Sequence, residues 1–532
     1  MTAPADVDEQ ATDVLVIGGG PAATWAAITA AERGSQVTLV DKGYCGTSGA
    51  TAAGGNNLWL IAPGRRREES IREREAAAGG LTDSDWMFRV LGTSWSRIEQ
   101  LARWGYPFPV DDDGRPMRSS LQGPEYMRRM RRKAHRSGVR ILDHHPALEL
   151  TADADGVVNG ATGLARQDGG RPWRITADAV VLATGGTAFL SGSFGTNVNT
   201  GDGLLMAAET GADLSGMEFS SAYALAPEWG THTKGRMLQW GSFYDEHGQP
   251  LATRPGLSGR KDAQWALAHG KRVFVRLDRA PEDIRQTMRD AQPNYFLPLD
   301  KAGIDPFVTA YPIRMVYEGS VRGTGGLRLI GTDCATTVPG LFAAGDAATR
   351  ELITGSISGG GSHNGSWAIA SGTFAGRGAS EFSLRREAGP ATVRERVGIR
   401  PGTHDAPSVD EVVHVAQQHI LPPLRSYLKS PMRLAESSAA LEKLWRDISR
   451  GLAPVAPRDA YKTRQAVALV AAARWITASS LARAESRGLH RREDVTVEDH
   501  HYRHRILVGG LDDVWTAPDP VLPQLISSEA VA

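Results

Sequence analysis

The sequence predicts an α/β protein that opens with a βαβ unit and ends in a helical region. Residues 13–43 read "DVLVIGGGPAATWAAITAAERGSQVTLVDKG", in which two β-rich apolar runs flank an Ala-rich run of helical length. Two more buried-looking strands, within 177–186 and 338–347, end in Thr-Gly-Gly and Gly-Asp. Near the C-terminus, "TRQAVALVAAARWITASSLARAESRG" carries apolar residues at helical spacing.

The βαβ unit has the motif of a dinucleotide-binding fold. Gly18, Gly20 and Ala23 form a G-x-G-x-x-A pattern between the first strand and the helix. Gly18 permits a tight turn, Gly20 lets a pyrophosphate approach the backbone, and Ala23 keeps the helix close to the strand. Asp41 ends the second strand, where a carboxylate accepts a hydrogen bond from a ribose hydroxyl. These features in this order predict a Rossmann-like unit.

The motif alone leaves open whether the dinucleotide is NAD or FAD. The strands within 177–186 and 338–347, together with the first unit, bracket more than 300 residues. A site assembled from segments so far apart suits a long molecule such as FAD. Asp346 can form a hydrogen bond with the ribityl chain of FAD.

Length and composition restrict the class of protein. A chain of 532 residues predicts two or three lobes, and 41% hydrophobic with 23% charged residues is typical of a soluble globular protein. Lys and Arg together number 60, as do Asp and Glu, so no charge excess indicates nucleic acid or a membrane surface. No apolar run approaches a membrane span, and the polar N-terminus is unlike a signal peptide.

The two cysteines cannot build a disulfide framework or hold an iron–sulfur cluster. The paired histidines at 144–145 and 500–501 have no metal-ligand partners at suitable spacing, so no metal site is expected. We therefore predict a cytoplasmic protein.

Several segments resemble the flavoprotein subunits of the succinate dehydrogenase and fumarate reductase family, which includes L-aspartate oxidase and the adenylylsulfate reductase α subunit. They are "SGATAAGG" (48–55), "NTGDGLLMAAETGADLSGMEF" (199–219), "VPGLFAAGDA" (338–347) and "RAESRGLHRREDVTVEDHHYRH" (483–504). The last resembles the C-terminal signature of family members with a helical third domain.

The resemblance implies a discontinuous FAD-binding domain, at 11–232 and 329–385. An α+β capping domain, at 233–328, is expected to close over the flavin, and a helical domain is expected at 405–505. The expected cofactor contacts come from the motif and from the matching segments: Gly18, Gly20, Pro21, Ala22, Ala23, Asp41, Lys42, Ser48, Gly49, Ala50, Thr51, Gly54, Gly55, Ala147, Leu148, Ala183, Thr184, Gly185, Asn199, Thr200, Asp202, Gly345, Asp346, Ser366, Trp367 and Ala368.

The chain departs from the family at the positions that bind dicarboxylates. Tyr223 stands where family members acting on succinate have a substrate-binding histidine, and Val321 stands at a second histidine position, with Arg322 beside it. The segment "ITGSISGGGSHNG" (353–365) lacks the arginine that family members have in this region. Because carboxylates need donors at both ends, these losses argue against succinate, fumarate or aspartate. Gly49 replaces a flavin-linking histidine, which predicts non-covalent FAD.

Four residues are candidates for catalysis. Arg236 lies within one position of the family's proton-shuttle arginine, with Glu218 or Glu228 as conceivable relays; otherwise it is a surface arginine. Arg322 would orient an anionic or carbonyl substrate, or else form a structural ion pair.

His363, in a Gly-rich loop expected to reach the isoalloxazine, suits acid–base work with its ordinary pKa, or serves as a strut for the loop. Tyr223, with Trp240 and Tyr311, would line an aromatic pocket or simply pack.

The leading function is an FAD-dependent oxidoreductase that moves a hydride between flavin and a small organic substrate. The alternatives are adenylylsulfate-reductase-like chemistry and a flavin-bearing electron-transfer subunit with an external redox partner protein. The substrate and the oligomeric state are not predicted.

Overall fold

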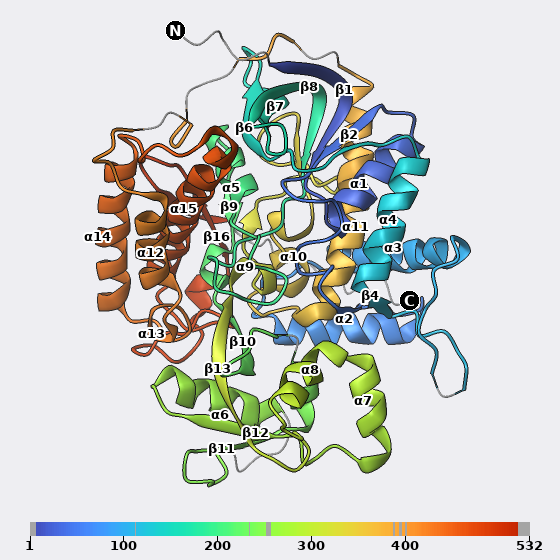
Figure 1. The fold of residues 1–532 in the computed structure, drawn as a ribbon, viewed down its shortest axis with the longest axis vertical. Coiled ribbons are helices and arrows are strands. Elements are labelled where there is room, and N and C mark those ends of the chain that lie inside the picture. The colour runs from blue at the N-terminus through green and yellow to red at the C-terminus, as the bar shows by residue number, and fades with distance from the viewer. Residues whose placement is uncertain are drawn as a thin grey trace, which may run out of the picture.

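The computed structural model describes residues 7–111, 113–233, 235–251, 257–386, 389–392, 396–399 and 402–519. Its largest sheet has the strand order β5-β2-β1-β8-β7-β6, and β15 pairs beside β8 (Figure 1). Strands β5, β2, β1, β8 and β15 are parallel, and β7 and β6 extend the sheet as antiparallel strands. The bounds are β1 (Asp8–Ile17), β2 (Val37–Val40), β5 (Arg140–Leu142), β6 (Ala147–Ala152), β7 (Val158–Ala165), β8 (Arg171–Leu182) and β15 (Leu341–Ala343).

Helices α1, α3, α4 and α11 pack together beside this sheet, on the right in Figure 1. The apolar run at the end of β1 is fully buried, and the Ala-rich helix after it is buried along most of its length. Glycines on α11 let it cross α1 closely, as described below. The bounds are α1 (Pro21–Glu32), α2 (Arg65–Ala77), α3 (Ser84–Arg103), α4 (Gly123–Arg136) and α11 (Gly360–Ser383).

A second unit, at the bottom of Figure 1, is built on the antiparallel sheet β10-β13-β12-β11, with helices α6, α7 and α8 around it. It has its own hydrophobic core, which includes Leu225, Phe243, Tyr295 and Ile313. Strand β10 precedes residue 233 yet pairs with β13, so the division of the chain at 233 stays a prediction. The bounds are β10 (Ala222–Pro227), β11 (Ser242–Tyr244), β12 (Val273–Arg276), β13 (Tyr311–Glu318), α6 (Leu257–Ala268), α7 (Arg285–Ala291) and α8 (Pro293–Lys301).

The C-terminal region contributes helices α12, α14 and α15, on the left in Figure 1. A third sheet, β14-β9-β16-β17, joins this region to the middle of the chain. One helix of the described residues, Pro457–Ala482, is long and apolar enough to span a membrane, but most of it is buried inside the protein, as in a core helix. The bounds are α12 (Val409–Ile420), α13 (Pro423–Ser426), α14 (Pro431–Ile448), α15 (Ala460–Ala482), β9 (Leu214–Ser215), β14 (Gly326–Leu327), β16 (Arg505–Gly509) and β17 (Trp515–Asp519).

A buried ion cluster holds the segment 483–504 against the middle of the chain. The Arg483 guanidinium donates to Glu218 and to Glu485, each at 2.9 Å, and all three side chains are fully buried. The Lys429 ammonium donates to the Glu218 carbonyl oxygen at 2.9 Å. The segment that resembles a family signature therefore acts as a polar anchor.

The remaining elements are short or connect the main ones: β3 (Gly55–Asn57), β4 (Ser120–Gln122), α5 (Asp202–Glu209), α9 (Gly319–Arg322), α10 (Glu351–Thr354) and the 3₁₀ helices η1 (Met217–Phe219), η2 (Arg236–Trp240), η3 (Glu282–Ile284), η4 (Gly345–Ala347), η5 (Pro457–Asp459) and η6 (His500–Tyr502). The Gly-rich segment predicted as a loop at 353–365 is instead largely helical, because α10 and the start of α11 take it up.

Candidate functional site: a long cavity between the N-terminal turn and helix α11

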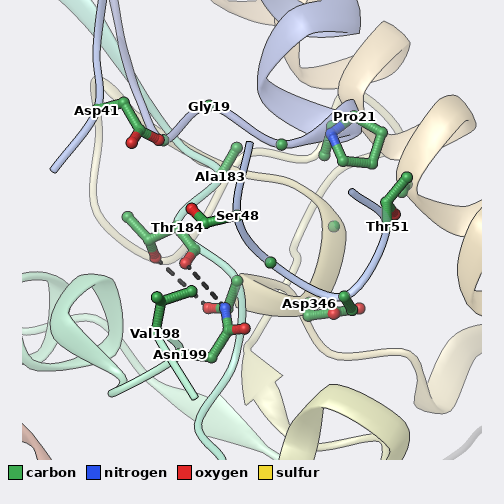
Figure 2. A pocket seen from close by; sticks show the side chains of 18 of the residues that line it. Gly19, Pro21, Asp41, Ser48, Thr51, Ala183, Thr184, Val198, Asn199 and Asp346 are labelled. Atoms are coloured by element: carbon green, nitrogen blue, oxygen red, sulfur yellow. Dashed lines mark hydrogen bonds between the residues drawn. The ribbon is translucent and has the colours of Figure 1, made fainter. Parts of the chain in front are cut away.

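One cavity runs from the β1–α1 turn, past the end of β8, to the start of α11 (Figure 2). It encloses about 1170 Å³, counting its open mouth. Of the predicted cofactor contacts it is lined by Gly18, Gly20, Pro21, Ala22, Asp41, Lys42, Ser48, Gly49, Ala50, Thr51, Ala147, Ala183, Thr184, Gly185, Asn199, Asp202, Gly345, Asp346 and Ala368. Segments from both ends of the chain therefore share one elongated site.

The first turn has the backbone that a dinucleotide needs. Gly18 has a φ of +122°, and a Cβ on it would collide with the Ala183 carbonyl oxygen. Gly20 has open space around its Cα, so a ligand can approach the chain there. Helix α1 begins at Pro21 without a side-chain cap, so its N-terminal N–H groups face that space.

Asp41 lies at the same end of the cavity as this turn (Figure 2). Its carboxylate accepts from the Gly43 N–H at 2.7 Å, and burial raises its pKa. Next to it, Lys42 forms an ion pair with Asp202 at 2.7 Å and donates to Thr200 at 2.9 Å. This wall of the cavity is thus polar and held by its own hydrogen bonds.

The middle of the cavity is walled by backbone. Gly49 has a φ of +91° and nothing within 4 Å of a Cβ placed on it. On the facing wall, the Asn199 amide donates to the Thr184 carbonyl at 3.5 Å (Figure 2). Both walls leave room for a flat or extended ligand.

The far end is formed by Asp346 and the first turns of α11. Burial raises the pKa of Asp346, and its ion pair with Arg350 opposes that shift. Arg350 also donates to the carbonyl oxygens of Ser320 and Val321, at 2.6 and 3.2 Å. The Asn364 amide donates to the Val321 carbonyl at 3.0 Å. The α9 turn is therefore fastened to both η4 and α11.

Seven predicted contacts do not line the cavity: Ala23, Gly54, Gly55, Leu148, Thr200, Ser366 and Trp367. Several of them support it from behind. The Trp367 indole donates to the Gly345 carbonyl at 2.8 Å, and the Ser366 hydroxyl donates to the Trp59 carbonyl at 3.0 Å.

Of the four catalytic candidates, Arg322 alone lines the cavity. Its Nε lies 3.6 Å from the Glu318 carboxylate, which accepts from the Thr233 hydroxyl at 2.7 Å. The predicted alternative of a structural ion pair is thus partly realised, although the distance exceeds a hydrogen bond.

The other three candidates lie elsewhere. Arg236 is exposed on η2. The Tyr223 hydroxyl is buried and donates to the Leu421 carbonyl at 2.9 Å, and burial raises its pKa well above the usual value. Of its expected neighbours, Tyr311 is buried in the core of the second unit and hydrogen-bonds to Tyr295, and Trp240 packs against the same core. These side chains pack and do not form one aromatic pocket.

His363 stands on the first turn of α11, where its ring stacks on Trp59 with centroids 4.4 Å apart. Its Nδ1 lies 2.9 Å from the Gly359 carbonyl. Burial and the nearby Arg74 guanidinium lower the pKa of His363 to about 3. An acid–base role near neutral pH does not fit this environment, and a strut does.

Sequence reasoning did not find Arg260. Burial lowers the pKa of its guanidinium, the nearby Glu318 carboxylate opposes that shift, and Arg322 adds to it. Arg260 therefore belongs to the charged group around Arg322. No motif marks it, because it lies on α6, far in sequence from Glu318 and Arg322. Among the described residues, no three His, Cys, Asp or Glu side chains converge as a metal site requires.

Comparison with known proteins agrees with this geometry. Residues 13–229 match the FAD binding domain model, and residues 433–515 match the fumarate reductase flavoprotein C-terminal model. L-aspartate oxidase of Streptomyces coelicolor is 25% identical over 96% of this chain and 93% of its own length. The fumarate reductase flavoprotein subunit of Mycobacterium tuberculosis is 27% identical over 70% of each chain.

Solved structures share the fold. Escherichia coli quinol fumarate reductase superposes with a TM-score of 0.81 at 20% identity, covering 97% of each chain. Adenylylsulfate reductase of Archaeoglobus fulgidus superposes with a TM-score of 0.77 at 18% identity, covering 97% of this chain and 96% of its own.

The fold, the cavity and these matches define an FAD-dependent oxidoreductase. The two matched models and these relatives make the chain similar, over most of its length, to the flavoproteins of the succinate dehydrogenase and fumarate reductase family.

Proposed function

We propose that this enzyme transfers a hydride between non-covalently bound FAD and a small organic substrate other than succinate or fumarate. The observation that carries the proposal is the single cavity that joins the β1–α1 turn to Arg322 and the start of α11. FAD supplies the hydride chemistry when bound, and the protein supplies orientation, charge and exclusion of water.

The residues of the cavity fit FAD along its length. The N–H groups at the start of α1 would hold the pyrophosphate, and Asp41 would accept from a ribose hydroxyl. Asp346 would hydrogen-bond the ribityl chain. In the first turn of α11 the Gly360 N–H donates to the Ser358 hydroxyl, and the N–H groups that follow it would stabilise negative charge on a reduced ring.

A non-covalent cofactor is supported by the side chains of the lining. Gly49 offers no nucleophile, and the described lining contains neither cysteine nor tyrosine. His145 does line the cavity, but its backbone N–H donates to the Asp41 carbonyl at 2.7 Å and its ring Nδ1 lies 2.6 Å from the Asp143 carbonyl, which places it at the Asp41 end. We therefore expect acid or heat to release the flavin intact.

The pocket chemistry also argues against dicarboxylates. Tyr223 uses its hydroxyl on the Leu421 carbonyl, and Val321 has no donor on its side chain. The remaining cavity-lining cation at this end is Arg322. A second carboxylate of succinate would lack a partner, and an unpaired buried charge is costly.

Purification of the yellow holoprotein, followed by acid precipitation, tests the cofactor and its attachment. All of the flavin should appear in the supernatant as FAD. Addition of succinate to the oxidised enzyme, or of fumarate to the photoreduced enzyme, should leave the flavin spectrum unchanged over minutes. Flavin that stays with the precipitate, or rapid bleaching by succinate, would refute the proposal.

Anaerobic photoreduction followed by mixing with oxygen tests which compound accepts the electrons. Fast reoxidation identifies an oxidase, and slow reoxidation indicates a nicotinamide or a redox partner protein. Spectral changes with sulfite and AMP would instead support the adenylylsulfate-reductase-like alternative. The cytoplasmic location stays a prediction.

A further inference from the structure

We propose that Arg322, placed beside Glu318, forms a subsite that selects substrates carrying one anionic group, such as a monocarboxylate. This inference rests on the proposed function, because it names the substrate class of the same site. It goes beyond that proposal by naming how many anionic groups the site accepts and which residue sets that number.

The Arg322 guanidinium occupies space that α11 leaves open. Gly361 is on the first turn of that helix, and a Cβ placed on it would lie 3.2 Å from Arg322 Nη1. A larger residue at 361 would displace the guanidinium. The segment 353–365 has no arginine of its own, so the cation at this end of the cavity comes from α9.

The backbone that carries Arg322 is fixed, whereas its side chain has donors to spare. The Arg322 carbonyl accepts from the Ser358 hydroxyl at 2.8 Å, and the Val321 carbonyl accepts from Asn364 and Arg350. By contrast, Arg322 Nε is buried with no hydrogen-bond partner among the described residues. A fixed cation with free donors beside a cavity is what an anion requires.

The charges around Arg322 leave room for one anion. Arg322 is the cation that lines this end of the cavity, and the Glu318 carboxylate lies 3.6 Å from its Nε. Asp346 and Arg350 pair with each other. One anionic group on the substrate can pair with the guanidinium of Arg322 on its cavity side. A second anionic group would add an unpaired charge close to Glu318.

Glu318 is held as an acceptor. Its carboxylate accepts from the Thr233 hydroxyl at 2.7 Å and from the Ser193 hydroxyl at 3.5 Å, and its side chain is buried. Donors from two other segments therefore keep the negative charge in position. Glu318 is the residue that sets the limit of one anion.

The test measures ligand binding by isothermal titration calorimetry and by the flavin difference spectrum of the holoprotein. The probes are propionate, succinate and propionamide, which carry one, two and no negative charges. We expect propionate to bind at least about tenfold more tightly than either of the others, as one charged hydrogen-bonding contact predicts.

Two substitutions should shift this preference in opposite directions. Arg322→Gln should weaken propionate about tenfold or more, with Arg322→Lys in between. Glu318→Gln should increase the affinity for succinate about tenfold and so narrow the difference between the affinities for propionate and succinate. The matched control is Arg272→Gln, an arginine of the second unit whose side chain is exposed. It should change none of the three affinities.

The inference is overturned if propionate fails to bind, if propionamide binds equally well, or if Arg322→Gln has no effect. It is also overturned if succinate binds best to the unaltered protein. Calorimetry needs no turnover, so this result is independent of hydride transfer. Loss of the proposed function would appear as absent flavin or absent redox chemistry, with the anion preference intact.

Discussion

His363 illustrates at the scale of a residue how surroundings decide what a side chain can do. Its ring lies on Trp59, and its pKa is lowered to about 3 by burial and by Arg74. An imidazole with so low a pKa stays neutral and is a weak base at physiological pH. Its contacts favour the predicted strut, which fixes the first turn of α11 beside the cavity.

The low pKa makes a prediction about stability. Between pH 6.5, the ordinary value, and about 3, the unfolded chain binds a proton at His363 that the folded protein does not. Stability from this group is therefore present above pH 6.5 and is lost as the pH falls through that window. The free energy of unfolding of the unaltered protein, minus that of His363→Phe, should rise with pH across the window and stay flat above it.

Urea unfolding at several pH values measures this difference, and Phe keeps the stack on Trp59. His363→Ala should lower stability by about 1–3 kcal/mol, with FAD still bound. If the pH profile of flavin reduction instead loses an ionisation near neutrality in His363→Phe, the residue acts in proton transfer.

Single residues also show which parts of the site sequence reasoning can reach. Gly18, Gly20 and Asp41 follow from a local pattern, because the strand, turn and helix that orient them are contiguous. Arg236 and Arg260 do not, since exposure of the first and partial burial of the second depend on how η2 and α6 lie against the rest of the protein. Functional placement of an arginine is a tertiary property.

At the scale of elements, the crossing of α1 and α11 depends on two glycines. A Cβ on Gly372 would collide with the Ala22 carbonyl oxygen, and one on Gly376 would collide with that of Ala26. The close approach places the first turn of α1 against the middle of α11. The first turns of α11 form the other end of the cavity, beside Asp346. Both ends of the cofactor site thus depend on this one helix contact.

Gly376→Ala should therefore destabilise the protein by about 1–3 kcal/mol, since the helices must separate. The matched control is Gly92→Ala in the middle of α3, where a Cβ would meet only Arg67 Nη1 at 3.9 Å. That change should stabilise by about 0.5–1 kcal/mol through helix propensity. Thermal unfolding of both variants checks the opposite signs. Two changes of the same sign would contradict the role given to the crossing.

The type of each element, helix or strand, could be predicted better than the residues at which it begins and ends. The strands within 13–43, 177–186 and 338–347 form where apolar runs indicate them. Helix α11 starts at Gly360, inside the segment predicted as a loop, because the packing of Trp59 and Leu58 on this turn orders glycines that local propensity leaves flexible.

At the scale of the whole molecule, the ion cluster of Glu218, Arg483 and Glu485 connects regions far apart in sequence. All three side chains are fully buried. Removing one partner of such a group leaves a charge without compensation.

Arg483→Met should cost about 3–5 kcal/mol of stability, because the carboxylates of Glu218 and Glu485 lose their shared partner. The control is Lys443→Gln, which breaks a surface pair with Asp447 and should change stability by less than about 0.5 kcal/mol. Denaturant unfolding of both holoproteins measures the difference. Equal effects would show that the cluster contributes no more than a surface pair.

FAD itself should stabilise the assembled chain, because its site uses residues from both halves of the discontinuous sheet. At free FAD about 100 times its Kd, the gain is about 2.7 kcal/mol. The melting temperature of protein stripped of flavin should rise on adding FAD and fail to rise on adding NAD. An equal response to NAD would contradict the assignment of the cofactor.

The pairing of β15 with β8 has a consequence for how the chain is made. Strand β8 is complete once residue 182 has been synthesised. Its neighbour β15, at 341–343, follows only after the entire second unit. During translation the emerging sheet therefore keeps an open edge until that late strand arrives, and the cavity is complete only afterwards, because Gly345, Asp346 and α11 line it. The second unit, which has its own core, is free to fold in that interval. Chain connectivity thus makes completion of the cofactor cavity a late event in the synthesis of this protein.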